Sequence, residues 1–138
     1  MKYYLSLGAN LGNREQTIRQ AIACIGQQIG PVVRISSFHY SAPWGFESEH
    51  AFCNVCCLVE TERTPLEVLH RTQAIERGLG RTEKTTDGHY TDRKIDIDLI
   101  LAFDGKKEIQ WNDDELTLPH PMWQQRAFVI EPLKEIYE

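Results

Sequence analysis

The segment Lys94-Ile95-Asp96-Ile97-Asp98-Leu99-Ile100-Leu101-Ala102-Phe103 is the most strand-like run in this chain. Its isoleucines, leucines and terminal phenylalanine are residues that favour extended structure. Successive side chains of a strand point to opposite faces, so Asp96 and Asp98 share one face while the apolar residues that alternate with them share the other. The segment therefore predicts one long strand that carries two carboxylates on a single face.

The surrounding sequence predicts two helices and three further strands, all within one domain over residues 1–138. Strands are expected at 2–7, 32–40 and 51–61. Helices are expected after Asn13, up to Gly30-Pro31, and after the capping sequence Thr64-Pro65-Leu66-Glu67, up to about residue 77. Asp104-Gly105 is a hairpin signal, so the segment through Trp111 is expected to fold back on the strand at 94–103, followed by a short tail.

This order of elements, β-α-β-β-α-β, predicts an α+β fold of the ferredoxin-like class, with a mostly antiparallel sheet plus a C-terminal hairpin. In such a fold both helices cover one face of the sheet. The other face is expected to be free for a ligand.

Composition narrows the function classes. The chain has 20 acidic and 15 basic residues and a formal charge of −5, which disfavours nonspecific binding to nucleic acid or to anionic lipid. It contains no apolar stretch of the roughly 18 residues that a membrane helix needs, and its start does not match a signal peptide. We expect a cytoplasmic monomer with small-molecule substrates.

Two local motifs have ordinary structural explanations. Cys53, Cys56 and Cys57 could suggest a metal site, but in a strand Cys56 points away from the other two, so buried free thiols are the better interpretation. Gly8-x-x-x-Gly12 lacks the spacing of a phosphate-binding loop. We interpret it as a strand-to-helix turn whose glycines adopt positive φ.

The aspartate pair is the more specific signal. Two carboxylates about 7 Å apart on one strand face repel each other unless a cation lies between them, and a hard divalent ion is the natural partner. The alternative is a solvated strand face. Because aspartate is disfavoured in strands, and occurs here twice in the most apolar one, metal binding is the favoured interpretation.

Nearby residues suggest a phosphorylated, aromatic ligand. Arg81 and Arg93 bracket a polar loop that could act as a lid, and Arg126 lies near His120; such guanidinium groups could neutralise phosphates or serve only as salt-bridge partners. Phe52 and Asn54 share one strand face, where they could stack on and hydrogen-bond a flat heterocycle, or serve merely as core and edge residues.

Taken together, the motifs resemble the family of 6-hydroxymethyl-7,8-dihydropterin pyrophosphokinases. The matching segments run through nearly the whole chain in family order: Leu5-Ser6-Leu7-Gly8-Ala9-Asn10-Leu11-Gly12, Ser41-Ala42-Pro43-Trp44-Gly45, Phe52-x-Asn54, Gln73-x-x-Glu76-x-x-Leu79-Gly80-Arg81, Asp92-Arg93-x-Ile95-Asp96-Ile97-Asp98-Leu99-Ile100-Leu101, Leu118-Pro119-His120-Pro121 and Arg126-x-Phe128.

The resemblance implies an ATP-dependent diphosphokinase of folate biosynthesis, which transfers pyrophosphate from ATP to the hydroxymethyl group of the reduced pterin and releases AMP. By resemblance, Asp96 and Asp98 hold two Mg²⁺ ions, and Arg81 and Arg93 meet the phosphates as catalytic residues. The implied pterin-binding residues are Ser41, Ala42, Pro43, Trp44, Phe52, Asn54 and Phe128. The implied nucleotide-binding residues are Gln73, Glu76, Arg93, Leu99, Thr117, His120 and Arg126.

Two other functions stay open at this point. One is a noncatalytic ferredoxin-like module that binds RNA or a small ligand, although the acidic charge and the absence of an RNA-binding aromatic motif disfavour RNA. The other is a relative that binds pterin without transferring phosphate, because Thr91-Asp92 stands where family members commonly have Gly-Pro.

Overall fold

The computed structural model describes residues 1–10, 12–41, 52–80 and 95–137. Its main sheet has the strand order β2-β4-β1-β5-β6, and β3 pairs with β4. These strands are β1 (Lys2–Ala9), β2 (Val32–Ile35), β3 (His39–Ser41), β4 (Phe52–Glu60), β5 (Asp96–Asp104) and β6 (Lys107–Glu108). Every neighbouring pair is antiparallel. The expected α+β fold with a mostly antiparallel sheet is confirmed.

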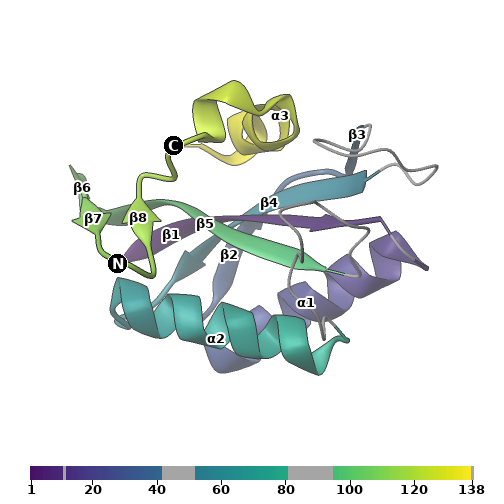
Figure 1. Ribbon diagram of the computed structural model, residues 1–138, viewed down its shortest axis with the longest axis horizontal. Helices are drawn as coiled ribbons and strands as arrows, with labels where there is room; N and C mark the ends of the chain where they lie inside the picture. The colour runs from purple at the N-terminus through teal and green to yellow at the C-terminus, as the bar shows by residue number, and fades with distance from the viewer. Residues whose placement is uncertain (11, 42–51, 81–94, 138) are drawn as a thin grey trace.

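Two helices, α1 (Arg14–Gln28) and α2 (Pro65–Gly78), lie together beneath one face of the sheet (Figure 1). Both begin at the expected caps. The Asn13 side chain accepts a hydrogen bond from the Gln16 N–H at 3.2 Å, and Thr64 and Glu67 form a reciprocal capping box. Alternate residues of the central strands form one apolar core with these helices, including Leu5, Leu7, Val55, Ile97, Ile18 and Val68.

Two expectations about the strands were wrong in detail. The single strand expected at 32–40 is split into β2 and β3, because Ser36 is bound to β4 between them: its N–H donates to the Cys56 carbonyl at 2.9 Å, and its hydroxyl accepts from the Cys56 N–H at 3.0 Å. The Asp104-Gly105 hairpin forms, but β6 ends at Glu108. The next strand, β7 (Trp111–Asn112), pairs with β8 (Thr117–Leu118) instead of β5.

A third helix corrects the expectation of a free sheet face. After a short 3₁₀ turn, Trp123–Gln125, helix α3 (Ala127–Ile136) lies across the face opposite α1 and α2 (Figure 1). Val129, Leu133 and Ile136 of α3 form a second apolar cluster with sheet residues that include Cys56, Leu58 and Ile100. Pro132 lies inside this helix and has no backbone N–H to donate within it. The tail expected at the C-terminus is therefore a structural layer.

The cysteines behave as expected. Cys53 and Cys57 lie in the cluster on the α1 and α2 side, and Cys56 lies in the cluster under α3. All four cysteines, including Cys24, are free thiols. Within the described ranges, no helix has the length and apolar character needed to cross a bilayer.

Candidate functional site

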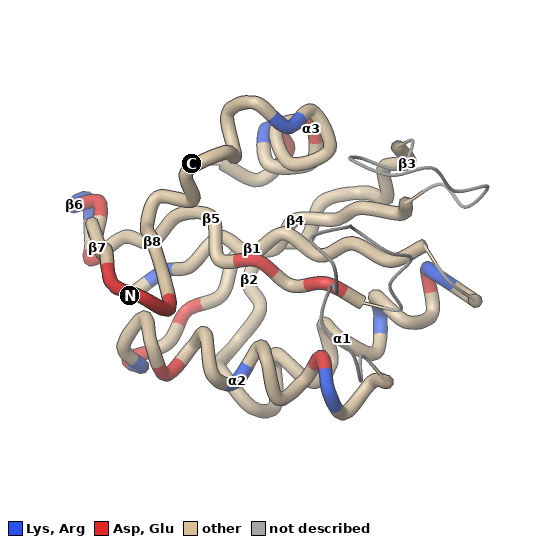
Figure 2. The backbone as a smooth tube through the Cα atoms, viewed as in Figure 1, with Lys and Arg blue, Asp and Glu red and all other residues tan. Residues whose placement is uncertain are grey.

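The predicted aspartate pair lies at the start of β5. Asp96 and Asp98 are both half-buried, whereas Ile97 and Leu99 are buried on the other face. Figure 2 shows acidic positions along β5, between α3 and the layer formed by α1 and α2. The strand therefore presents two carboxylates on the same face as α3, as its sequence predicts.

A polar row crosses the sheet from these aspartates to the predicted pterin residues. Asp96 lies opposite Gly8 of β1, and Gly8 lies opposite Asn54 of β4. The Asn54 side chain is only 2% exposed, and its Nδ2 donates to Ser41 Oγ at 2.8 Å. This hydrogen bond orients the amide. The strand pairing places Asn54 and Asp96 on either side of Gly8, on one face of the sheet.

Gly8 makes room on this surface. A methyl group at Gly8 would lie 3.1 Å from Asn54 Oδ1 and 3.6 Å from Phe52 Cδ1. Among the described glycines, positive φ angles occur at Gly12, Gly80 and Gly105. The expected positive φ is therefore confirmed at Gly12 and wrong at Gly8, where the missing side chain matters for space.

His120 and Arg126 add nitrogen groups beside the aspartates. The His120 N–H donates to the Ile100 carbonyl of β5 at 2.9 Å, which fixes the histidine against the sheet. Burial lowers the pKa of His120, the Arg126 guanidinium lowers it further, and the Asp96 carboxylate opposes both effects. The surroundings therefore favour the neutral imidazole, and its pKa depends on both the Asp96 carboxylate and the Arg126 guanidinium.

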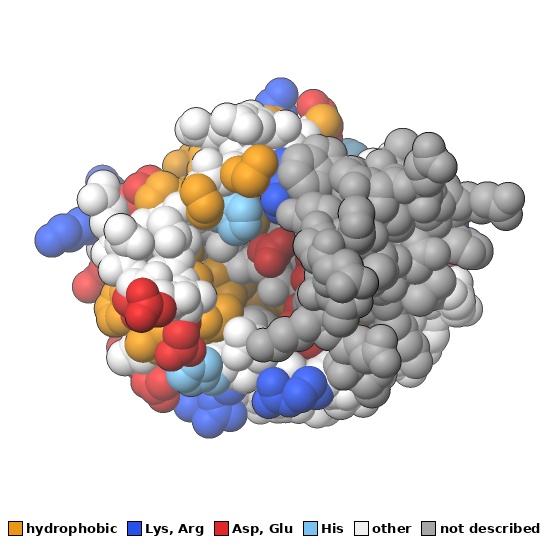
Figure 3. Space-filling view, viewed as in Figure 1, with side chains coloured by type: hydrophobic (Ala, Val, Ile, Leu, Met, Phe, Trp, Pro, Cys, Tyr) orange, Lys and Arg blue, Asp and Glu red, His pale blue; other side chains and the backbone are white. Residues whose placement is uncertain are grey.

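The start of α3 carries the remaining predicted aromatic residue. Arg126 precedes the helix, and its guanidinium carbon lies 5.7 Å from the centre of the Phe128 ring, a cation–π distance. Figure 3 shows acidic, basic and histidine side chains gathered near the middle of this side of the molecule. The structure therefore brings a carboxylate pair, a guanidinium and aromatic and amide groups into one region.

Four further predicted nucleotide residues differ in their exposure to solvent. Leu99 is 3% exposed and packs in the core on the α1 and α2 side, so its side chain faces away from the aspartates. Glu76 is also buried, and its carboxylate binds the backbone of β5. Gln73 is exposed on α2. Thr117 is exposed on β8, where its hydroxyl contacts Asn112 Oδ1 at 3.4 Å.

Other predicted site residues lie outside the described residues. These are Ala42, Pro43 and Trp44 of the pterin set, the arginines Arg81 and Arg93, and the expected lid at 82–92.

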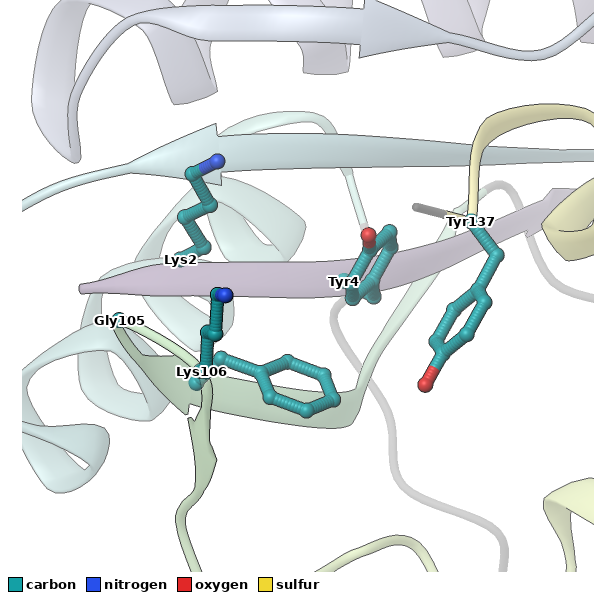
Figure 4. A pocket seen from close by; sticks show the side chains of 6 residues that line it. Lys2, Tyr4, Gly105, Lys106 and Tyr137 are labelled. Atoms are coloured by element: carbon teal, nitrogen blue, oxygen red, sulfur yellow. The ribbon is translucent and has the colours of Figure 1, made fainter.

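The described part of the chain contains no group of three or more His, Cys, Asp or Glu side chains arranged to hold a metal ion. Its potential metal ligands at this site are thus the two aspartates. A cavity of about 610 Å³ lies elsewhere and is lined by Lys2, Tyr4, Phe103, Gly105, Lys106 and Tyr137 (Figure 4). It contains none of the predicted site residues.

Sequence reasoning missed two small residues of the site. Gly8 and Ser6 of β1 lie directly opposite Asp96 and Asp98. The signal was present, because Tyr4, Ser6 and Gly8 alternate with the apolar residues of the same strand. Pairing that polar face with the aspartates required the strand order, which the sequence alone indicated only through the fold class.

Known proteins that are similar to this chain in sequence agree with the family that its motifs resemble. The chain is 44% identical over 133 residues to 2-amino-4-hydroxy-6-hydroxymethyldihydropteridine pyrophosphokinase of Porphyromonas gingivalis, covering 96% of this chain and 88% of the relative. The Bacillus subtilis protein of the same name is 37% identical over 134 residues, covering 96% of this chain and 76% of that protein.

The fold is similar to that of a solved HPPK-DHPS structure in complex with substrates, with a TM-score of 0.68 and 14% sequence identity over 98% of this chain and 40% of that one. The family model of 7,8-dihydro-6-hydroxymethylpterin-pyrophosphokinase matches residues 4–138. With the aspartate pair, the polar row and the Arg126–Phe128 pair in place, these matches show that the chain belongs to the 7,8-dihydro-6-hydroxymethylpterin-pyrophosphokinase family.

Proposed function

We propose that this protein transfers pyrophosphate from ATP to the hydroxymethyl group of 6-hydroxymethyl-7,8-dihydropterin, releasing AMP, as a step of folate biosynthesis. The observation that carries the proposal is the polar row in which Asp96, Gly8 and Asn54 lie side by side on three neighbouring strands. A phosphate-binding group on β5 and a heterocycle-binding group on β4 would thereby be held on one surface, two strand spacings apart with β1 between them.

The donor set fits magnesium. Mg²⁺ prefers oxygen ligands and is usually held by one or two carboxylates together with water and substrate phosphates, not by a complete protein cage. Asp96 and Asp98 supply two half-buried carboxylates, and the described residues offer no third acidic or histidine ligand in the cluster. We infer that these aspartates hold two Mg²⁺ ions, which when bound supply charge neutralisation to the phosphates of ATP.

The remaining polar side chains are assigned by their chemistry. Arg126, with Arg81 and Arg93 assigned from the sequence pattern alone, would neutralise phosphate oxygens. Burial and Arg126 lower the pKa of His120 and so favour its neutral form, which can donate or accept a hydrogen bond without adding charge. Thr117 and Gln73 are exposed and, together with Leu99, are assigned to the nucleotide side from the sequence pattern.

The pterin is assigned to the other end of the row. Phe52 and Phe128 would stack on the two faces of its ring, and the Asn54 amide, oriented by Ser41, would read its polar edge. Ala42, Pro43 and Trp44 complete this assignment from the sequence. Phosphoryl transfer requires little covalent help from protein groups, so positioning and charge neutralisation account for the catalysis.

We extend the proposal to the domain organisation, the oligomeric state and the location of the protein. We assign the chain to a single ferredoxin-like domain, supported by the strand order β2-β4-β1-β5 and by α1 and α2 on one face. We also infer a cytoplasmic monomer with ATP and reduced pterin as its substrates. The formal charge of −5 disfavours nonspecific binding to nucleic acid or anionic lipid.

Product analysis tests the proposed reaction. The full chain is incubated with ATP, Mg²⁺ and hydroxymethyldihydropterin, and the nucleotides and pterins are separated by chromatography. AMP and pterin diphosphate in equal amounts are expected. ADP with a pterin monophosphate would indicate ordinary kinase chemistry, and pterin binding without any nucleotide product would indicate a relative that has lost the transfer step.

A further inference from the structure

The edge of β5 that does not face β1 is hydrogen-bonded by several different parts of the chain. Near its end, β6 pairs with Phe103 and Asp104. Further back, the Ile109 N–H donates to the Ala102 carbonyl at 2.8 Å, and the His120 N–H donates to the Ile100 carbonyl at 2.9 Å. β6 is too short to reach the aspartate-bearing start of the strand. Another group is needed there, because a buried backbone N–H costs free energy unless it is bonded.

Glu76 of α2 supplies that group. Its Oε2 accepts a hydrogen bond from the Ile97 N–H at 2.7 Å, and Ile97 lies between Asp96 and Asp98. The length is typical of a charge-assisted hydrogen bond, which is stronger than a neutral one. The Glu76 carboxylate therefore stands where the carbonyl of a neighbouring strand would otherwise be.

Burial makes this contact specific. Glu76 is 7% exposed and the Ile97 side chain is 4% exposed, so water cannot easily replace the carboxylate. A carboxylate is taken out of water only at a cost, which hydrogen bonds such as this one offset. Both ends of the contact are firmly held, since α2 and β5 belong to the same apolar core through Ile75 and Ile97.

We propose that Glu76 is a positioning residue, which holds the Asp96–Asp98 segment in register by binding the Ile97 N–H. This proposal rests on the proposed function, because it assigns those aspartates to the metal site. It differs from the nucleotide contact that the sequence pattern implies for Glu76: the carboxylate acts through the backbone of β5, and its reach matters more than its charge.

Two conservative variants separate reach from charge. Glu76→Gln keeps the length of the side chain and an acceptor oxygen but removes the charge, whereas Glu76→Asp keeps the charge and shortens the side chain by one methylene. Arg77→Ala, an exposed neighbour on the same helix, serves as the control. The readout is amide hydrogen exchange at Ile97, followed by NMR in the full chain without nucleotide, pterin or Mg²⁺, with the His120 amide as an internal reference.

We expect Glu76→Asp to accelerate Ile97 exchange about tenfold or more, relative to His120, as loss of one buried charge-assisted hydrogen bond does. Glu76→Gln should accelerate exchange distinctly less, by about threefold, because an amide oxygen still accepts the bond but without the charge. In turnover assays, Glu76→Asp should lower kcat with little change in the Kd for ATP. Glu76→Gln should retain most of the kcat of the original protein.

The opposite pattern would overturn the proposal. If Ile97 exchange is unchanged in Glu76→Asp, or equally fast in both variants, Glu76 does not hold the strand. A rise in the Kd for ATP with unchanged exchange would show a nucleotide contact instead. Because the exchange experiment uses no substrate, it can succeed even if product analysis finds no AMP, so the two proposals fail separately.

Discussion

Gly8 shows how a single missing side chain shapes the site. It lies in the middle of the row between Asp96 and Asn54, and a Cβ there would approach both Asn54 and Phe52. The sequence marks Gly8 as unusual but cannot show why, because the reason lies on two other strands.

Replacing Gly8 tests this use of space. Gly8→Ala should weaken pterin binding about tenfold, which corresponds to about 1.4 kcal/mol, because the methyl group would lie 3.1 Å from Asn54 Oδ1 and displace the amide. Calorimetric titration with the pterin measures this. Gly26→Ala is the matched control, since no heavy atom lies within 4 Å of the added methyl, and it should leave pterin affinity unchanged. Equal affinity in Gly8→Ala would show that the pterin does not approach this row.

His120 reports on the charge of the aspartates. Burial and Arg126 lower its pKa and Asp96 raises it. A cation bound at Asp96 cancels the raising effect, so saturating Mg²⁺ should lower the pKa of His120 further. The pKa is followed by NMR of the imidazole ring protons across a pH series, with the signal assigned by its loss in His120→Gln.

Asp96→Asn should lower the same pKa without metal, and Mg²⁺ should have no effect in the Asp96→Asn, Asp98→Asn double variant. A pKa of His120 that Mg²⁺ leaves unchanged in the original protein would argue against metal binding beside Asp96.

At the scale of elements, one carboxylate adds polar contacts to the apolar packing that holds α3 on the sheet. Glu135 accepts hydrogen bonds from the Ser37 N–H at 2.8 Å and from the Ser37 hydroxyl at 2.8 Å, and it contacts His39 Nε2. These bonds, with the Ser37 backbone bond as the largest cause and His39 next, lower the pKa of Glu135 to about 2. The end of α3 is thereby held against β3, while its start carries Phe128.

Removing this carboxylate should loosen α3. Glu135→Gln is expected to lower the melting temperature by a few degrees at pH 7. A carboxyl whose pKa is lower in the folded chain stabilises it above the ordinary value, near 4.5, and loses that effect as the pH falls towards 2. The difference between the two proteins should therefore shrink between pH 4.5 and 2.

Thermal unfolding followed by circular dichroism measures the difference. Glu131→Gln is the matched control, because Glu131 is exposed on the same helix and lies 3.9 Å from Lys134. A pH-independent difference in Glu135→Gln would mean that the charge of Glu135 does not hold the helix.

The helices that the sequence predicted and the one it missed differ in their signals. α1 and α2 follow explicit caps, Asn13 and Thr64-x-x-Glu67, and were found within a residue or two. α3 has no side-chain cap and contains Pro132, so local rules favour a tail. The missed signal was in the sheet: Val55 to Val59 of β4 are apolar on both faces, and a strand buried on both faces requires a second covering layer.

At the scale of the whole molecule, the helices on the two faces of the sheet have different roles. The layer of α1 and α2 closes the main core, and α3 covers the opposite face beside the aspartates (Figure 1). The sequence predicted the sheet, the aspartate pair and the aromatic–amide pair, because strand periodicity places side chains on faces. It could not predict that Glu76 binds the backbone of β5, because that contact depends on packing between elements.

The most direct test of the account is the rate of AMP release by Asp96→Asn and Asp98→Asn at saturating ATP, pterin and Mg²⁺. Asp104→Asn, at the exposed far end of the same strand, is the control and should keep the original rate. Each site variant should lose at least about a hundredfold in kcat while keeping its circular dichroism spectrum, because charge stabilisation of a transferring group is worth several kcal/mol. Release of AMP at the control rate by either site variant would contradict the central claim that this pair of carboxylates holds the metal for pyrophosphoryl transfer.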